Sequence, residues 1–155
     1  MTQKDTFSRW HDYIAVSTTV IAVLAAVSSL RAGSMASLLL LEKNNSNLYQ
    51  SQANKEWNHY LASEITSRVL QKSPNTAEQQ RFQAEAERFE TQAESSTKKA
   101  SVYFENSSHL ATAGTFLEAG IALSAMAVLL RQKKIWIFSL LLAGVGAFFL
   151  IVGFL

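Results

Sequence analysis

The run of residues 135–155 carries no charge over 21 positions and constrains this chain more than any other feature. A helix rises about 1.5 Å per residue, so this run has the length of one bilayer crossing. A second apolar run covers residues 110–130 and is interrupted only by Glu118, and a basic tetrad at residues 131–134 separates the two runs. The pattern predicts a membrane hairpin over residues 110–155, with helices at 110–130 and 135–155.

A third apolar segment lies near the amino terminus. Residues 13–30 carry no charge, and the apolar character resumes after Arg31. We therefore expect a short segment at residues 1–12 and a first membrane helix at residues 13–41. The alternative is a cleaved signal peptide, because the chain starts with basic residues and has small residues near positions 26–29.

Aromatic and basic residues flank the apolar runs and indicate an orientation. Aromatic side chains with one polar edge favour the headgroup region, and the predicted interfacial anchors are Trp10, Tyr13 and Trp136. With three crossings, the amino terminus and the 131–134 loop share one side, which is cytoplasmic by the positive-inside rule. We expect the inner (cytoplasmic) membrane of a bacterium, with the segment between the first two crossings in the periplasm.

Residues 42–109 are polar and predict a long antiparallel helical hairpin, a coiled-coil stalk, between the first two membrane helices. Pro74, the only proline, disfavours helical geometry in the residue before it, so we place the turn near residues 72–75. Residues 76–110 show a heptad in which small and aromatic residues alternate, which suits a closely packed partner helix. The predicted packing seam consists of Phe82, Ala86, Phe89, Ala93, Ala100 and Tyr103. A disordered polar linker is the alternative.

One part of the predicted stalk has low helix propensity. Residues 44–47 read Asn-Asn-Ser-Asn, and such side chains compete for backbone hydrogen bonds. We expect a kink or a local break in the helix at this point.

Two ionisable residues, Arg31 and Glu118, interrupt the apolar segments. With Pro74 at the tip, an antiparallel hairpin brings them to nearly equal depth, and each alone near a helix centre costs about 2.5–3.5 kcal/mol. We therefore predict an intramembrane ion pair between them. The pair is either a structural lock that fixes helix register or part of a proton or ion relay, and the absence of a second acidic group on these helices favours the lock.

Small residues spaced four apart recur in the predicted membrane helices. This spacing lets helix backbones approach closely in lipid. The sets are Thr18-Ala22-Ala26, Gly120-Ser124 and Ala143-Ala147.

The sequence shows no motif for catalysis, a cofactor or a metal. It contains no cysteine, and residues 31–110 balance nine basic against nine acidic residues, so we expect no nucleic-acid partner. Glu56 and His59 have a Glu-x-x-His spacing, and Glu105 with His109 adds another acid and histidine. The predicted hairpin separates these two groups by about 30 Å, which excludes a shared metal.

The whole chain resembles the bacterial membrane family known as domain of unknown function 4337. The resemblance rests on AVLAAVSSLRAG in the first helix, on NKEWNHYLASEI, where Trp57 and Tyr60 fit the family's aromatic pattern, and on FLEAGIALSAMAVLLRQKKIW at the closing hairpin. The polar residues 44–47 depart from the family. The resemblance implies a bacterial integral membrane protein and brings no assigned activity.

Taken together, these features predict an all-α integral membrane protein with three transmembrane helices and a stalk. We expect a non-enzymatic scaffold or structural subunit that self-associates in the lipid bilayer through its membrane helices and stalk. The stalk residues predicted to contact other copies are Trp57, Tyr60 and Leu61, because a two-helix hairpin leaves them partly exposed. The alternatives are a channel or transporter accessory subunit that uses the Arg31–Glu118 pair, and an envelope sensor that relays to a partner protein. Another membrane protein is the alternative to a second copy as a partner.

Overall fold

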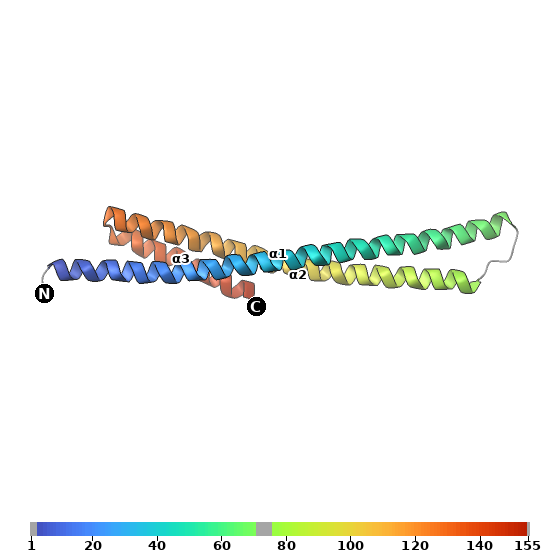
Figure 1. The fold of residues 1–155 in the computed structure, drawn as a ribbon, viewed down its shortest axis with the longest axis horizontal. Coiled ribbons are helices and arrows are strands. Elements are labelled where there is room, and N and C mark those ends of the chain that lie inside the picture. The colour runs from blue at the N-terminus through green and yellow to red at the C-terminus, as the bar shows by residue number, and fades with distance from the viewer. Residues whose placement is uncertain (1–2, 71–75, 155) are drawn as a thin grey trace. The chain divides into compact units, whose positions relative to one another are not determined.

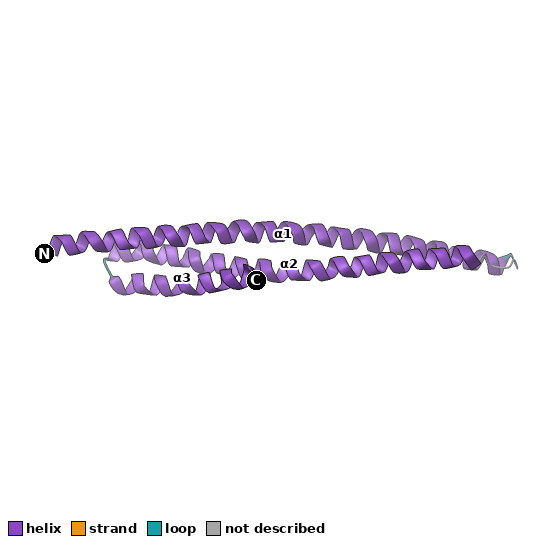
Figure 2. Ribbon diagram, turned by 90° about the horizontal axis from the view of Figure 1, so that it is seen from below, coloured by secondary structure: helices purple, strands orange, loops and turns teal. Residues whose placement is uncertain are grey.

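Three long helices make up the part of the chain that the structure describes (Figure 2). The computed structural model describes the backbone of residues 3–70 and 76–154, and within these ranges the side chains from residue 10 onward. The helices are α1 (Gln3–Val69), α2 (Thr76–Leu130) and α3 (Lys133–Phe154). No strand occurs in the described ranges, so the predicted all-α class is confirmed.

Each of the three helices contains a segment that is long and apolar enough to cross a membrane, which we call a candidate span. The candidate spans agree with the three apolar runs of the sequence. In α3 the only charged residues are Lys133 and Lys134, at its first turn.

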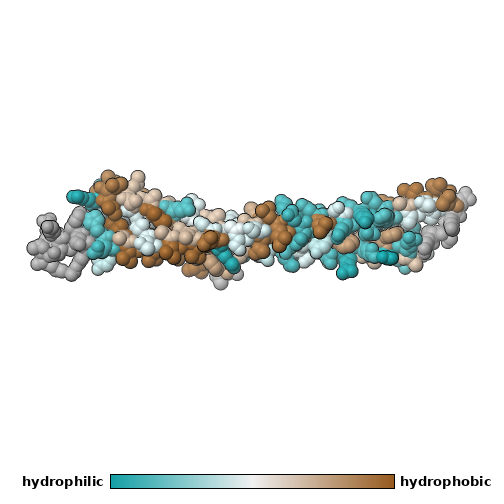
Figure 3. Space-filling view, viewed as in Figure 1, coloured by the Kyte–Doolittle hydropathy of each residue, from teal (hydrophilic) through white to brown (hydrophobic). Residues whose placement is uncertain are grey.

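The chain forms two compact units, each of which contains parts of both α1 and α2. The apolar unit comprises residues 1–36 and 104–155, and the polar unit comprises residues 37–103. In Figure 3, hydrophobic atoms predominate on the visible face of the apolar unit and hydrophilic atoms on that of the polar unit.

In the apolar unit, α3 lies beside the carboxyl-terminal part of α2 and the amino-terminal part of α1 (Figures 1 and 2). The contact between α2 and α3 is close because α3 carries glycines there. A Cβ built on Gly146 would lie 2.8 Å from Cγ of Leu117, and one built on Gly153 would lie 2.9 Å from Cγ of Leu110. The core of this unit consists of Ile21, Ala25, Leu117 and Ala143, with Leu24, Ile121 and Leu150 packed against it.

Buried hydroxyl groups also join the three helices of the apolar unit. The Ser28 hydroxyl of α1 donates to the carbonyl oxygen of Leu110 in α2 over 2.6 Å. Ser124 of α2 and Ser139 of α3 share a hydrogen bond of 2.8 Å. All three serines are fully buried, so these bonds satisfy polar groups that would otherwise lose their hydration without compensation.

A two-residue connection joins α2 to α3. Arg131 has a φ of 52°, the left-handed conformation that commonly ends a helix. Its amide donates to the carbonyl oxygen of Val128 over 3.3 Å, and the Gln132 amide donates to that of Ala127 over 3.2 Å. These bonds satisfy carbonyl groups at the end of α2 and reverse the chain at the basic tetrad.

In the polar unit, side chains of α1 meet side chains of α2. Ser46 and Thr97 share a hydrogen bond of 2.9 Å, and Nε1 of Trp57 donates to a carboxylate oxygen of Glu90 over 2.7 Å. Within the predicted seam the small residues are buried and the aromatic residues are half-buried. The buried members are Ala86, Ala93 and Ala100, and the half-buried members are Phe82, Phe89 and Tyr103.

The prediction of a break at residues 44–47 is wrong, because α1 continues through these residues without interruption. Ser46 is buried, and its hydroxyl bonds to Thr97 of α2 rather than to the local backbone. A tertiary contact thus overrides the weak helix propensity of this segment. The turn expected near residues 72–75 lies outside the described residues.

Candidate functional site in the apolar unit

The structure does not bring Arg31 and Glu118 together. Ser28 bonds to Leu110, and the Ser107 hydroxyl donates to the carbonyl oxygen of Ala32 over 3.5 Å, so Arg31 lies opposite a position near residue 108. The ten residues from there to Glu118 correspond to about 15 Å along the helix. The predicted ion pair is therefore not formed. The extrapolation from a distant turn failed because side-chain contacts, and not the position of the turn, set the register here.

Glu118 lies level with the middle of α3. Leu117 lies against Gly146 and Gly120 lies against Ala143, which places Glu118 near residue 145 of α3. That position is twelve residues after the first residue of α3 and nine before its last. The Glu118 carboxyl group therefore lies near the midpoint of α3, measured along the helix axis.

The Glu118 side chain points away from α1 and α3. It is exposed, whereas Leu117, Gly120 and Ser124 of the same helix are buried. Within residues 10–70 and 76–154, its carboxyl group makes no ion pair or hydrogen bond.

Small residues flank Glu118 on the same side of α2. Positions three, four and seven residues apart share one helix face. Together with Glu118, these exposed or half-buried residues form what we call the Glu118 face: Ala111, Thr115, Ala122 and Ala125. The Thr115 hydroxyl donates to the carbonyl oxygen of Ala111 over 3.1 Å. Between Ala111 and Ala125 the face therefore carries small side chains apart from that of Glu118.

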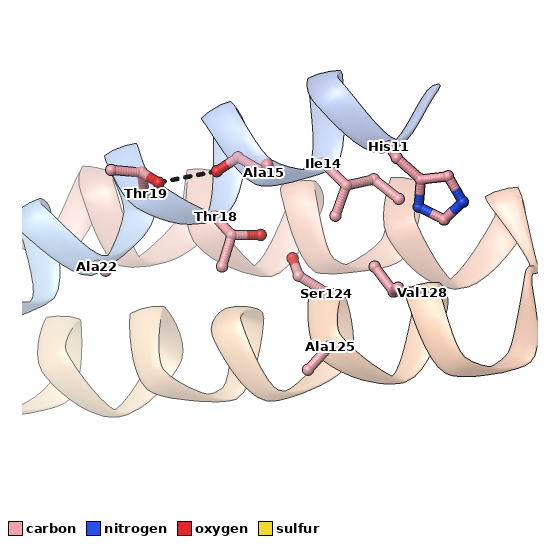
Figure 4. Close-up of a pocket in the computed structure, with 9 residues that line it drawn as sticks. All are labelled: His11, Ile14, Ala15, Thr18, Thr19, Ala22, Ser124, Ala125 and Val128. Carbon is pink, nitrogen blue, oxygen red and sulfur yellow. Dashed lines mark hydrogen bonds between the residues drawn. The ribbon is translucent and has the colours of Figure 1, made fainter. Parts of the chain in front are cut away.

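A groove between α1 and α2 adjoins the Glu118 face at Ala125 (Figure 4). It has a volume of about 630 Å³ and is lined mainly by small side chains, including Thr18 and Ala22 of α1. Thr19 forms its hydrogen bond within α1, where its hydroxyl donates to the carbonyl oxygen of Ala15 over 2.9 Å. The predicted small residues Thr18 and Ala22 thus line an open groove.

Arg31 has an aromatic neighbour at the end of α3. Its guanidinium carbon lies 5.4 Å from the ring centroid of Phe154. Nearby, His109 stacks on Phe149 and Phe149 stacks on Phe116, with centroid distances of 6.3 and 6.0 Å. The rings of His109, Phe149 and Phe116 therefore form a cluster at this end of the apolar unit.

The predicted interfacial anchors have three different surroundings. Trp10 is buried and lies beside the His11 ring, with centroids 5.2 Å apart. Tyr13 is 65% exposed. Trp136 donates from Nε1 to the Ser17 hydroxyl over 3.1 Å and so connects α3 to α1.

The predicted oligomer-contact residues lie in the polar unit. Trp57 and Tyr60 meet edge to face with centroids 5.8 Å apart, and Leu61 is exposed. His59, from the Glu-x-x-His spacing, stacks on Phe82 at 5.6 Å. Among the described residues, no three His, Asp or Glu side chains are grouped so that they could hold a metal ion.

A family model described as "Domain of unknown function (DUF4337)" matches residues 10–155, nearly the whole chain. The chain belongs to the DUF4337 family. The searches of curated proteins and of solved structures gave no match.

Sequence reasoning missed two of the three fully buried serines of this DUF4337 protein, Ser28 and Ser139. Ser28, Ser124 and Ser139 lie within apolar runs, where a hydroxyl can bond across helices. Only Ser124 was singled out, through its spacing from Gly120. The signal that could have found Ser139 is a lone serine in an otherwise apolar run. Ser28 is followed directly by Ser29, so the sequence does not single it out.

Proposed function

We propose that this protein is a non-enzymatic membrane scaffold subunit that self-associates. In this proposal all three candidate spans cross a bilayer, and residues 37–103 form an antiparallel helical-hairpin stalk outside it. The observation that carries the proposal is the exposed Glu118, which lies level with the middle of α3.

A carboxyl group at this depth requires a polar partner. A charged side chain near the centre of a membrane helix costs about 2.5–3.5 kcal/mol on insertion scales. Such residues accordingly face a helix bundle or a water-filled cavity rather than lipid. Since Glu118 faces neither α1 nor α3, a further membrane helix should cover it.

A second copy of the chain fits this requirement. Copies in one membrane share an orientation, so their α2 helices run parallel and equivalent residues meet at equal depth around a symmetry axis. Glu118 then meets a second carboxyl group, with which it can share a proton and a hydrogen bond. Ala122 and Thr115, one turn to either side, are small enough to let the two backbones approach.

The orientation of the proposed scaffold follows from charge. By the positive-inside rule, the basic residues of the amino terminus and of the α2–α3 connection support a cytoplasmic location of these segments in a bacterium and a periplasmic location of the stalk. Trp57, Tyr60 and Leu61 then remain available for contacts between stalks.

Single cysteines test the proposed interface, because the chain has none of its own. Ala122→Cys lies on the Glu118 face, and Leu141→Cys is an exposed control at the same depth on α3, since Gly120 pairs with Ala143. Oxidation in native membranes should cross-link the Ala122→Cys variant to a dimer, because disulfides require Cα atoms within about 7 Å. The Leu141→Cys variant should stay monomeric on a denaturing gel. Equal cross-linking of both variants, or of neither, would contradict the proposal.

A channel accessory subunit is the second candidate, and the exposure of Glu118 also favours it. If several copies placed Glu118 around water, a Glu118→Cys variant would react with a membrane-impermeant thiol reagent. A dry contact between copies predicts no such reaction. The version of this candidate that uses an Arg31–Glu118 pair lacks a geometric basis, because the two residues lie about 15 Å apart along the helix axis.

A further inference from the structure

We infer that Arg31 and the groove beside it bind the phosphate group and one acyl chain of an anionic membrane lipid. The groove has a volume of about 280 Å³ and is lined by Val27, Leu30, Arg31, Ser34 and Phe154. The inference rests on the membrane position of the proposed function but not on self-association.

Arg31 lies level with the end of α3. Gly153 packs against Leu110, and Arg31 lies opposite a position near residue 108. If α3 spans the bilayer, its last turn reaches the boundary between hydrocarbon and headgroups, since its 22 residues extend over about 33 Å. Arg31 therefore lies at the depth of lipid phosphates and not in the hydrocarbon.

The guanidinium group of Arg31 has an aromatic neighbour but, within residues 10–70 and 76–154, no anionic partner. Its guanidinium carbon lies 5.4 Å from the centroid of the Phe154 ring, and this cation–π contact restricts rotation of the side chain. The N–H groups of a guanidinium point outward within its own plane, so the contact with the ring does not use them. In the described part of the chain, no carboxylate forms an ion pair with it. Five fixed donors in one plane match the oxygens of a phosphate.

The groove is lined almost entirely by apolar surface, and Arg31 and Ser34 are its polar lining residues. Ser34 lies about one turn from Arg31 toward the polar unit, and its exposed hydroxyl can contribute a further hydrogen bond. Leu30 and Val27 lie toward the middle of the candidate span, and both are exposed. A phosphate at Arg31 would thus place an attached acyl chain along Leu30 and Val27. Inorganic phosphate would leave this apolar part of the groove uncovered.

Native mass spectrometry of the delipidated full-length protein tests the inference. The probe is synthetic phosphatidylglycerol, compared with diacylglycerol of the same two acyl chains and with inorganic phosphate alone. We expect phosphatidylglycerol to bind the wild-type protein about tenfold more tightly than diacylglycerol, because charge-assisted hydrogen bonds to phosphate are lost without the headgroup. Inorganic phosphate should not displace the lipid.

The variant Arg31→Gln should bind phosphatidylglycerol about tenfold more weakly and diacylglycerol unchanged. Lys134→Gln removes an exposed charge from the opposite end of α3 and should leave both affinities unchanged. Equal phosphatidylglycerol binding by wild type and Arg31→Gln would overturn the inference. Displacement by inorganic phosphate would also overturn it, because the site would then be one for a free anion.

The experiment distinguishes failure of the lipid site from misfolding of the variant and from failure of self-association. If Arg31→Gln does not fold, the wild-type comparison between phosphatidylglycerol and diacylglycerol decides, and equal binding of the two overturns the inference. The same spectra report the number of copies in the complex. A wild-type oligomer without headgroup preference would contradict the lipid site alone, and a lipid-binding monomer would contradict self-association alone.

Discussion

Gly144 and Gly146 lie two residues apart in α3, yet their surroundings differ sharply. A Cβ on Gly146 would lie 2.8 Å from Leu117 Cγ and 3.1 Å from the carbonyl oxygen of Ala113. A Cβ on Gly144 would have nothing within 4 Å. At the scale of single residues, the packing of α3 on α2 therefore depends on one glycine and not on its neighbour.

We predict that Gly146→Ala destabilises the protein by about 1–3 kcal/mol, the usual cost of overpacking a tight contact. The matched control Gly144→Ala should leave stability unchanged or raise it slightly, because alanine favours the helix. Thermal unfolding in detergent, followed by circular dichroism, measures both. Equal melting temperatures for the two variants would show that α3 does not pack on α2 as described.

Removing the carboxyl group of Glu118 should weaken association of the copies. Hydrogen bonds between membrane helices contribute about 1–2 kcal/mol in model peptides, so Glu118→Ala should raise the dissociation constant by roughly 5- to 30-fold. Glu118→Gln keeps a donor and an acceptor and should associate nearly as well as the wild type. Analytical ultracentrifugation in detergent measures the constants. An unchanged constant for Glu118→Ala would mean that Glu118 does not contribute to the interface.

At the scale of elements, the helices were predictable because their signals are local. Uncharged runs and a heptad with high helix propensity identify segments without reference to the rest of the chain. The pairing of Ser28 with Leu110, in contrast, depends on how two helices meet. Counting from a turn about forty residues away put Glu118 opposite Arg31, whereas the contacts place it near residue 21. The small residues were recognised as packing signals, but their sequence does not say which of them face a neighbour within the chain.

Ion pairs within α2 give its polar part a pH dependence. The Lys98 ammonium group bonds to Glu94 over 2.8 Å and lowers the pKa of that carboxyl group, and Glu94 raises the pKa of Lys98. The stabilisation from a lowered carboxyl pKa is present above the unfolded-state pKa and is lost as pH falls through the folded-state value. The stabilisation from the raised lysine pKa is present below its unfolded-state pKa and is lost as pH rises through the folded-state value.

We therefore expect helicity to be highest at pH values between the titration of the Glu94 carboxyl group and that of Lys98. Helicity should decrease slightly below and above this pH range. Glu94→Gln should lower the helicity within this pH range and reduce its decrease at low and at high pH. The control Glu105→Gln, an exposed carboxyl group without an ion pair in the described ranges, should leave the profile unchanged. Circular dichroism at 222 nm as a function of pH, at low salt, makes the comparison. A Glu94→Gln profile identical to that of the wild type would contradict the contribution of this pair.

At the scale of the whole molecule, charge distribution predicts which segments lie on which side of the membrane. Arg131 lies in the α2–α3 connection and Lys133 and Lys134 lie in the first turn of α3, whereas residues 31–110 are balanced in charge. By the positive-inside rule, this asymmetry predicts that the α2–α3 connection lies in the cytoplasm and the polar unit on the other side of the membrane.

Cysteine accessibility checks this orientation. Ser95→Cys, at an exposed position of the polar unit, should react with an impermeant maleimide in intact bacterial spheroplasts. Gln132→Cys, in the α2–α3 connection, should react only after the membrane is opened. The reverse pattern would place the stalk in the cytoplasm and overturn the proposed topology.

The two-residue connection between α2 and α3 has a consequence for biosynthesis. If these helices cross a bilayer as proposed, the connection is too short to form a soluble loop between them, and we expect them to partition from the translocon into lipid as one unit. The strongly apolar α3 then offsets the insertion cost of the carboxyl group in α2, about 2.5–3.5 kcal/mol if charged. A chain that stops before α3 should accordingly insert α2 less completely in a translation assay with microsomes, and Glu118→Leu should restore its insertion. In the proposed topology, the helix that carries the ionisable group would thus depend, during its synthesis, on the helix that follows it.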